Sequence, residues 1–488
     1  MTRAGQLLSV LTVALFLGLA GFELRHTVAM LGHPYPTEYG EGVNLLWASR
    51  LADGLPLYPA VSKDDLPHLH HPYPPLGPLA VGTLRRAMPG SSPFLPGRLV
   101  SVVGAALAGL GLWILARRRL SAAAATVAVA LFALSPVTLR FGPMMRIDPL
   151  PLGLSLLALV LVDRNRTPAQ FAVAAALAAL AALAKPTYVA ALLVVGSMAL
   201  LQPQRRRSAA AAAVGALIPL AAIGAWIAMR ESPHLWLHMV ALHRLPADPG
   251  GLLDWAGRFA GVHALLLAGL AAWLRYGPTE DRHLRCYAAI ALGIGLVSGL
   301  TMGSQENYLF EALAMSALAA AWLWERVRRS APATAWAAAA MQGLLFLPIE
   351  PAPVFTRTYG QELPPGAGAT WRITAADREI GDVITAEIDA ADGAVLSSDV
   401  GYLLAAGRDP VMQPYQFGRL AEAGRWDLAT LARAVEEGRF GLIILKGEAE
   451  EADDPYFPPR IQQAIHTRYA LHRVIGPWHL YRPSDHSD

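Results

Sequence analysis

Long apolar stretches alternate with short polar hinges over the first 350 residues of this chain. A membrane-spanning helix needs about 20 mostly apolar residues, with a range of about 17–25. The stretches that meet or approach this length lie at 6–24, 97–116, 121–140, 147–162, 168–184, 186–202, 208–229, 259–274, 286–302, 307–324 and 331–348. The pattern therefore predicts a mainly α-helical, polytopic membrane bundle of about 11 transmembrane helices.

Lysine and arginine concentrate in alternate hinges between these stretches. The basic hinges lie at 117–119, 163–166, 204–207, 275–285 and 325–329. Positively charged loops stay in the cytoplasm, so these hinges and the N-terminus are expected on the cytoplasmic side of the cell inner membrane. The remaining hinges, and everything after residue 349, are then extracytoplasmic. The first stretch is expected to stay as an anchor, because no small-x-small cleavage site follows it.

The first external loop, residues 25–96, carries helical patterns of its own. The segment EGVNLLWASRLADG, which begins at Glu41, predicts a helix. The segment YPPLGPLAVGTLRRAM is apolar, but it is short and begins with prolines. It predicts a helix lying on the membrane surface, because counting it as a span would place the arginines at 117–119 outside.

The pattern changes after Pro353, where the chain becomes more polar. The helical stretches TAADREIGDVITAEIDA and LATLARAVEEGRF alternate with the strand-like runs GAVLSS, FGLIILK and YALHRVIGPWHLYRP. We therefore expect a membrane domain over 1–350, a Pro- and Gly-rich linker over 351–372 and an extracytoplasmic α/β domain over 373–488.

The composition agrees with a membrane protein and excludes other classes. The chain is 54% hydrophobic and 16% charged, whereas soluble domains carry about 25% charged residues. The net charge of +3 is small and the arginine runs flank apolar stretches, so no nucleic-acid partner is expected. The single cysteine, Cys286, cannot form an internal disulfide. Without a Walker motif or a GxGxxG-led βαβ unit, a nucleotide-driven mechanism has no support.

Ionisable residues gather in the hinges predicted to be external. Glu38 and Glu41 are three residues apart and would share a face if both were helical. Arg146 and Asp148 lie at the mouth of a predicted helix, where they could act on a substrate or form a structural ion pair. Lys185 stands alone between two apolar stretches, so it either extends to the interface or binds a phosphate.

Other candidates lie in the first, fourth and fifth external loops. Glu311 is one turn inside a predicted span, where a carboxylate needs a partner or a role. The histidines of HLHH could bind a divalent metal, although nothing in their spacing defines a ligand geometry. His234 and His238 are four residues apart and could share a helix face. A carboxylate base beside cations at one membrane face suits group transfer from a phosphorylated lipid.

Several of these segments resemble a known superfamily. TEYGEGVNLLWASRLADGLPLYP, followed by HPYPPLGPL, resembles the first external loop of bacterial GT-C glycosyltransferases. These multi-pass enzymes are related to protein O-mannosyltransferases and lipid A aminoarabinose transferases. MMRIDPLPLGLSLL resembles their second external loop, and GSQENYLFEALA and the C-terminal tail resemble an uncharacterised bacterial branch. The resemblance covers nearly the whole chain and is specific for the superfamily rather than for a substrate.

The resemblance implies a reaction and a set of site residues. Such enzymes transfer a sugar from a polyprenyl-phosphate carrier to an acceptor outside the cytoplasm. The catalytic base would be Glu38 or Glu41, and the acidic position of the second loop corresponds to Asp148. The family's Lys-Pro-Pro-Leu motif begins here with Tyr73, so Lys185 or Arg146 would have to replace its phosphate-binding lysine.

The resemblance also implies substrate contacts from Asn307, Tyr308 and Glu311. A divalent metal, where relatives use one, would bind at His238, with His243 as the rival position. The expected partners are the bilayer, a polyprenyl-phosphate-linked sugar as donor and an unidentified glycan, lipid or protein as acceptor.

The favoured function is therefore an inverting, polyprenyl-phosphate-sugar-dependent glycosyltransferase. One alternative is a transporter or flippase of lipid-linked glycans, which would carry charges and broken helices near the middle of its spans. Another is a non-catalytic membrane scaffold, in which the acidic residues of the first loop would be dispensable. A ligase or polymerase that joins preassembled glycans would share much of the same chemistry.

Overall fold

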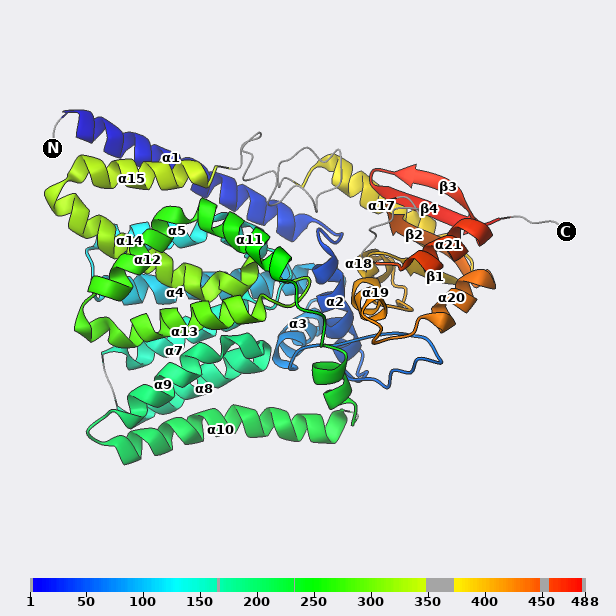
Figure 1. Cartoon of the computed structure of the whole chain (residues 1–488), viewed down its shortest axis with the longest axis horizontal. Helices are drawn as coiled ribbons and strands as arrows, with labels where there is room; N and C mark the ends of the chain where they lie inside the picture. Colours follow the sequence, from blue (N-terminus) through cyan, green and yellow to red (C-terminus); the bar gives the residue numbers. More distant parts are fainter. Residues whose placement is uncertain (1–2, 165–166, 232, 348–372, 448–455, 485–488) are drawn as a thin grey trace.

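The computed structural model describes residues 3–164, 167–231, 233–347, 373–447 and 456–484. A bundle of helices forms one end of the molecule, and a smaller domain with a sheet forms the other (Figure 1). This arrangement confirms the predicted class, a mainly helical chain with an α/β domain near its C-terminus. The predicted linker, residues 351–372, lies outside the described residues.

The bundle contains a helix at every predicted apolar stretch. Its helices are α1 (Arg3–Gly32), α4 (Leu95–Arg117), α5 (Ala122–Ala133), α6 (Pro136–Phe141), α7 (Pro149–Asp163), α8 (Pro168–Ala184), α9 (Ala190–Leu200), α10 (Arg205–Arg230), α11 (Pro249–Val262), α12 (Ala264–Tyr276), α13 (Arg282–Ser298), α14 (Phe310–Ser330) and α15 (Pro332–Leu345). Proline at the first helical position and Ser or Thr caps begin several of them. Small residues let helices approach: a Cβ on Gly215 of α10 would lie 2.0 Å from the carbonyl oxygen of Ala172 in α8.

Two predicted stretches are each divided into two helices. The stretch 259–274 falls across α11 and α12, which meet at an angle of 88°. At this break the ring of His263 stacks on Phe259 at 4.3 Å, and its Nδ1 bonds the Phe259 carbonyl oxygen. The stretch 121–140 is divided because Pro136 has no N–H to continue α5, and Ser135 caps α6 instead.

The number of spans expected from the sequence stays a prediction. Among the described helices, α1, α4 and α10 are each long and apolar enough to cross a membrane, and α11 with α12 would make a fourth as a broken span. Shorter apolar helices cover 122–133, 149–163, 168–184 and 186–200. Large apolar side chains on the outer surfaces of α1 and α10, such as Leu17 and Leu217, are exposed. A bilayer would cover them.

Three of the basic hinges meet at one end of the bundle. Arg119 forms ion pairs with Asp163 and with Asp281, the latter at 2.6 Å. His283 Nε2 lies 2.9 Å from the same Asp163 carboxylate. Hinges that the sequence assigns to one side of the membrane therefore lie side by side.

The C-terminal domain contains a four-stranded sheet with helices around it. Its elements are α17 (Ala375–Asp389), β1 (Ala394–Ser397), α18 (Val400–Ala405), α19 (Pro414–Glu422), α20 (Ala429–Glu436), β2 (Phe440–Lys446), α21 (Pro459–Arg468), β3 (Tyr469–Ile475) and β4 (Trp478–Pro483). The strand order is β1-β2-β4-β3, with β1 parallel to β2 and the other pairs antiparallel. The run YALHRVIGPWHLYRP forms two strands rather than one, because the chain turns at Gly476, whose φ is 57°.

The loop of residues 33–94, between α1 and α4, joins the bundle to this domain. It forms the expected helices α2 (Tyr39–Ala52) and α3 (Leu76–Ala87). A Cβ on Gly42 of α2 would lie 2.4 Å from the backbone nitrogen of Gly401 in α18, so the two helices touch through backbone. His68 accepts a backbone hydrogen bond from Gln413 and donates one to Val411. These contacts hold the C-terminal domain over one end of the bundle (Figure 1).

Candidate active site

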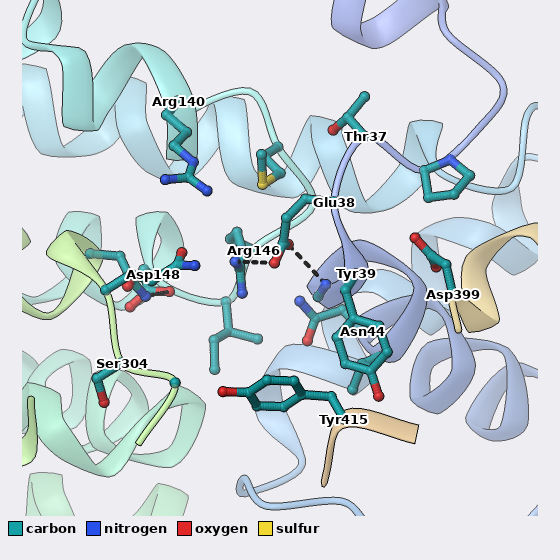
Figure 2. Close-up of a pocket in the computed structure, with 18 of the residues that line it drawn as sticks. Thr37, Glu38, Tyr39, Asn44, Arg140, Arg146, Asp148, Ser304, Asp399 and Tyr415 are labelled. Carbon is teal, nitrogen blue, oxygen red and sulfur yellow. Dashed lines mark hydrogen bonds and ion pairs between the residues drawn. The ribbon is translucent and has the colours of Figure 1, made fainter. Parts of the chain in front are cut away.

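A cavity of about 590 Å³ lies where the bundle, the first loop and the C-terminal domain meet. Its walls come from three parts of the chain that are distant in sequence. The first loop contributes Glu38, Tyr39 and Tyr73; the bundle contributes Arg140, Arg146, Asp148, Asn307 and Tyr308; the C-terminal domain contributes Ser398, Asp399, Tyr415, Lys446, Tyr456 and Trp478. Figure 2 shows Glu38 near the middle of this cavity, with Arg146 and Asp148 on one side and Asp399 on the other.

Glu38 faces the cavity as the N-cap residue of α2. Its Oε2 accepts a hydrogen bond of 2.8 Å from the backbone N–H of Gly40. Its Oε1 lies 2.8 Å from Nη2 of Arg146, and the two side chains are 13% and 17% exposed. The carboxylate is thus held in a defined position while one edge of the ion pair remains accessible from the cavity.

Glu41 is completely buried and does not line the cavity. Arg98 donates to both of its oxygens, at 2.9 and 2.7 Å. The backbone N–H of Met145 and the N–H and hydroxyl of Thr37 donate to it as well. Burial by itself raises the pKa of Glu41, but Arg98 and these donors outweigh it and hold the pKa at about 2. This environment is that of a structural carboxylate.

Asp148, which lines the cavity, forms a buried ion pair with Lys185. Lys185 Nζ lies 2.7 Å from Asp148 Oδ1, and the side chains are 2% and 1% exposed. Asn307 donates to the other oxygen of Asp148 at 3.0 Å. Lys185 Nζ also lies 4.0 Å from the ring centroid of Tyr308. Residues from three hinges that are distant in sequence are thereby joined.

These contacts distinguish between interpretations that the sequence leaves open. Arg146 pairs with Glu38 rather than with Asp148, although Asp148 is only two residues away. Lys185 is buried instead of extending to the membrane interface. Its Nζ lies 6.0 Å from the ring centroid of Tyr73. The Lys185 ammonium is therefore close to the position at which the similar Lys-Pro-Pro-Leu motif has lysine and this chain has Tyr73.

Glu311 has a partner but lies outside the cavity lining. The hydroxyl of Tyr287 donates to its Oε1 at 2.7 Å, within the bundle. The expectation that a carboxylate inside a span needs a partner is therefore met by a neighbouring helix.

The histidines form a buried ring cluster. His70 stacks on His238 and His243 with ring centroids 6.0 and 6.1 Å apart. Both ring nitrogens of His238 are used: Nε2 donates to the Pro59 carbonyl at 2.7 Å, and Nδ1 accepts from the backbone N–H of His71 at 3.1 Å. Burial lowers the pKa of His71 to about 3 and also lowers the pKa of His238.

This arrangement does not fit the metal site expected at His238 or His243. Within the described ranges, no group of three or more His, Cys, Asp or Glu side chains is arranged to hold a metal ion. A metal ligand needs a nitrogen lone pair, and His238 has already committed both nitrogens to the backbone.

Sequence reasoning missed several cavity residues. Arg140 lies in α6 on the same side of the cavity as Arg146 (Figure 2). It falls at the last position of a predicted apolar stretch, where an arginine is naturally taken for a span boundary. Asp399 lies at the end of β1, and its Oδ1 accepts from the Gly401 N–H at 2.7 Å. Burial, with the nearby charge of Glu38, raises the pKa of Asp399 to about 7.

Comparisons with known proteins agree with this architecture. Residues 74–229 match the family described as dolichyl-phosphate-mannose-protein mannosyltransferase. No curated protein matches the sequence significantly. ArnT from Cupriavidus metallidurans in the apo state is similar in structure, with a TM-score of 0.62 and 13% identity over 96% of this chain and 97% of that chain. The same protein bound to undecaprenyl phosphate has the same TM-score and identity, with 99% of each chain covered.

An archaeal oligosaccharyltransferase is also similar. AglB from Archaeoglobus fulgidus, in complex with an inhibitory peptide and a dolichol-phosphate, has a TM-score of 0.46 and 14% identity, over 97% of this chain and 74% of that chain.

Proposed function

We propose that this chain, which has the fold of the GT-C superfamily of membrane glycosyltransferases, transfers a sugar from a polyprenyl-phosphate donor to an acceptor hydroxyl. The reaction takes place on the extracytoplasmic side and inverts the anomeric carbon. One relative of the same fold has been crystallised with undecaprenyl phosphate, which supports a lipid-phosphate donor.

The observation that carries this proposal is the pair formed by Glu38 and Arg146 at the cavity. A carboxylate and a guanidinium 2.8 Å apart offer a proton acceptor and an anion ligand side by side. Arg140 adds a second guanidinium on the same side of the cavity. A phosphate bound by two arginines would release the Glu38 carboxylate from Arg146, because both anions compete for the same cation.

The proposed step moves one proton and exchanges one C–O bond. Glu38 accepts the proton of the acceptor hydroxyl as its oxygen attacks the anomeric carbon. The bond from that carbon to the phosphate oxygen breaks on the opposite face, which inverts the configuration. The negative charge that develops on the departing polyprenyl phosphate is stabilised by Arg140 and Arg146. The proton remains on Glu38 until the product leaves.

Glu38 is a better candidate for the base than Glu41 because only Glu38 borders the cavity. Asp148 is a positioning residue in this scheme. Its carboxylate is held by Asn307 and holds the ammonium of Lys185. The Lys185 ammonium therefore lies beside Tyr73 and Tyr308, where its charge strengthens the positive potential at the phosphate.

The experiment compares variants of the purified protein in liposomes. A panel of radiolabelled polyprenyl-phosphate sugars is supplied, membrane extract is added as acceptor, and release of polyprenyl phosphate is followed. Loss of a general base slows catalysis by roughly 100- to 10,000-fold. We expect this loss in Glu38→Gln, with a similar melting temperature and a donor affinity at least as high as that of the wild type, because the carboxylate that competes for Arg146 is removed.

The matched control is Glu436→Gln, because Glu436 is exposed on α20 away from the cavity. It should release polyprenyl phosphate at the wild-type rate. Undiminished turnover in Glu38→Gln would refute the assignment of the base. Absence of donor cleavage in the wild type with every donor would refute the proposed activity.

A further inference from the structure

We propose that the wall of the cavity formed by Asp399, Tyr415 and Tyr456 of the C-terminal domain, together with Tyr39, is the acceptor subsite, and that it takes a carbohydrate. This inference rests on the proposed function and extends it to the class of acceptor. The C-terminal domain then forms part of the active site rather than a separate binding module.

The two sides of the cavity differ in chemistry. Arg140 and Arg146 lie on the bundle side, where an anionic donor would bind. Tyr39 and Asp399 lie on the other side of Glu38 in Figure 2, and Tyr415 lies below them. A base that removes a proton from the acceptor must lie between the acceptor and the donor, and Glu38 occupies this position.

Three tyrosines form a cluster on the acceptor side. The ring centroids of Tyr39 and Tyr415 are 6.0 Å apart, those of Tyr39 and Tyr456 are 5.7 Å apart, and those of Tyr415 and Tyr456 are 6.1 Å apart. The rings come from α2, from α19 and from the segment before α21. Aromatic faces accept the C–H faces of a sugar ring, while phenol hydroxyls bond its polar edge.

Tyr415 also reaches across the cavity to the fifth external loop. A Cβ on Gly303 would lie 2.4 Å from the Tyr415 hydroxyl, and the φ of Gly303 is 82°. Glycine therefore suits this position both for its backbone conformation and for the close approach of the phenol. The contact holds the tyrosine of the C-terminal domain against the bundle, which limits the width of the subsite.

Asp399 supplies a polar group in a fixed orientation. It is 7% exposed, and its Oδ1 is held by the Gly401 N–H at 2.7 Å. Ser398 and Lys446 line the same part of the cavity. A carboxyl group, a serine hydroxyl, an ammonium and phenols around aromatic faces match a molecule with many hydroxyls. A lipid acceptor would instead require a continuous aliphatic surface.

The test separates donor cleavage by water from transfer to an acceptor. Undecaprenyl-phosphate release is measured in liposomes without acceptor and then with maltotriose, chitotriose or mannotriose. We expect at least one trisaccharide to accelerate release by the wild type. Tyr415→Ala and Asp399→Asn should raise the KM for that trisaccharide at least tenfold and should reduce transfer much more than hydrolysis by water. Asparagine is a good N-cap residue, so Asp399→Asn preserves the start of α18.

Matched controls are Tyr276→Ala and Asp427→Asn, because both residues are exposed and lie outside the cavity lining. They should leave the KM for the trisaccharide unchanged. The carbohydrate assignment would be overturned if serine- or threonine-containing peptides accelerated release and no trisaccharide did. It would also be overturned if neither peptides nor trisaccharides accelerated release. An equal loss of hydrolysis and transfer in Tyr415→Ala and Asp399→Asn would indicate a structural role and would also overturn it.

A binding measurement distinguishes failure of this inference from failure of the proposed function. Saturation-transfer NMR with the same trisaccharides requires no turnover. Binding to the wild type that is lost in Tyr415→Ala, without donor cleavage, would support the subsite and refute the transferase. Donor cleavage without trisaccharide binding would support the transferase and refute the subsite.

Discussion

Glu38 and Glu41 show how much the surroundings of a residue decide its chemistry. They are three residues apart and carry the same carboxylate. Glu38 shares a partly exposed ion pair with Arg146, whereas Glu41 is enclosed by Arg98 and by three further hydrogen-bond donors from Thr37 and Met145. The first arrangement leaves a carboxylate beside a cavity, and the second ties α2 to the bundle.

Replacing Glu41 should therefore affect stability first. In Glu41→Gln the guanidinium of Arg98 stays buried without its counter-charge, and breaking such a buried pair costs about 3–5 kcal/mol. We expect a clearly lower melting temperature in detergent, measured by scanning fluorimetry. Glu379→Gln on the exposed surface of α17 is the control and should melt like the wild type.

The same pair has a defined pH dependence. The pKa of Glu41 is depressed to about 2 in the folded protein from an ordinary value of 4.5. Its stabilising contribution is complete above about pH 4.5 and is lost as the pH falls toward 2, because the unfolded chain binds the proton more tightly there. A Glu41→Gln variant whose melting temperature equalled that of the wild type at pH 7 would contradict this role.

At the scale of elements, the contact between α2 and α18 holds the C-terminal domain, and with it the wall formed by Asp399, Tyr415 and Tyr456, against the rest of the cavity. The two helices meet through Gly42 and Gly401, with a separation that leaves no room for a methyl group. Asp399 caps α18, and Glu38 caps α2, so a shift between these helices would move both acids relative to one another.

Gly42→Ala should separate the two helices. Its new Cβ would meet backbone, which cannot rotate aside, and overpacking of this kind typically costs about 1–3 kcal/mol. We expect transfer to the acceptor to fall more than donor hydrolysis, since the acceptor wall is displaced while the bundle stays intact. Gly257→Ala on α11, where nothing lies within 4 Å, should leave both rates unchanged. Equal rates in Gly42→Ala and the wild type would show that this contact does not position the wall.

At the scale of the whole molecule, the two ends of the bundle have different roles. One end gathers the basic hinges around Asp163, and the other end carries the cavity and the C-terminal domain. The alternation of basic hinges predicts that the first end faces the cytoplasm and that the second end faces outside.

The native cysteine offers a direct test of this orientation. Cys286 is exposed near the start of α13, at the end that carries the basic hinges. A membrane-impermeant maleimide should leave it unlabelled in intact cells and label it after permeabilisation. In a Cys286→Ser background, Asp427→Cys on the C-terminal domain should be labelled in intact cells. The opposite labelling pattern would invert the topology and would place the cavity in the cytoplasm.

The fold was predictable because its signals are local. Apolar stretches, alternate basic hinges, proline at helix starts and the β-branched runs of the tail each act over a few residues. They determined the positions of the helices, including α3, and the mixed character of the C-terminal domain. The break at His263 and the division at Ser135 were not apparent, since each lies within an apolar stretch whose overall hydropathy remains high.

The arrangement of the candidate site depended on contacts between segments far apart in the chain. The sequence identified the acids and cations of the external loops, including Glu38, Arg146 and Lys185. It could not pair Lys185 with Asp148 or bury Glu41 against Arg98, since partners 37 and 57 residues away leave no periodic signal. It also could not bring Asp399 and Tyr415 to the cavity, since only the docking of the C-terminal domain on α2 places them there.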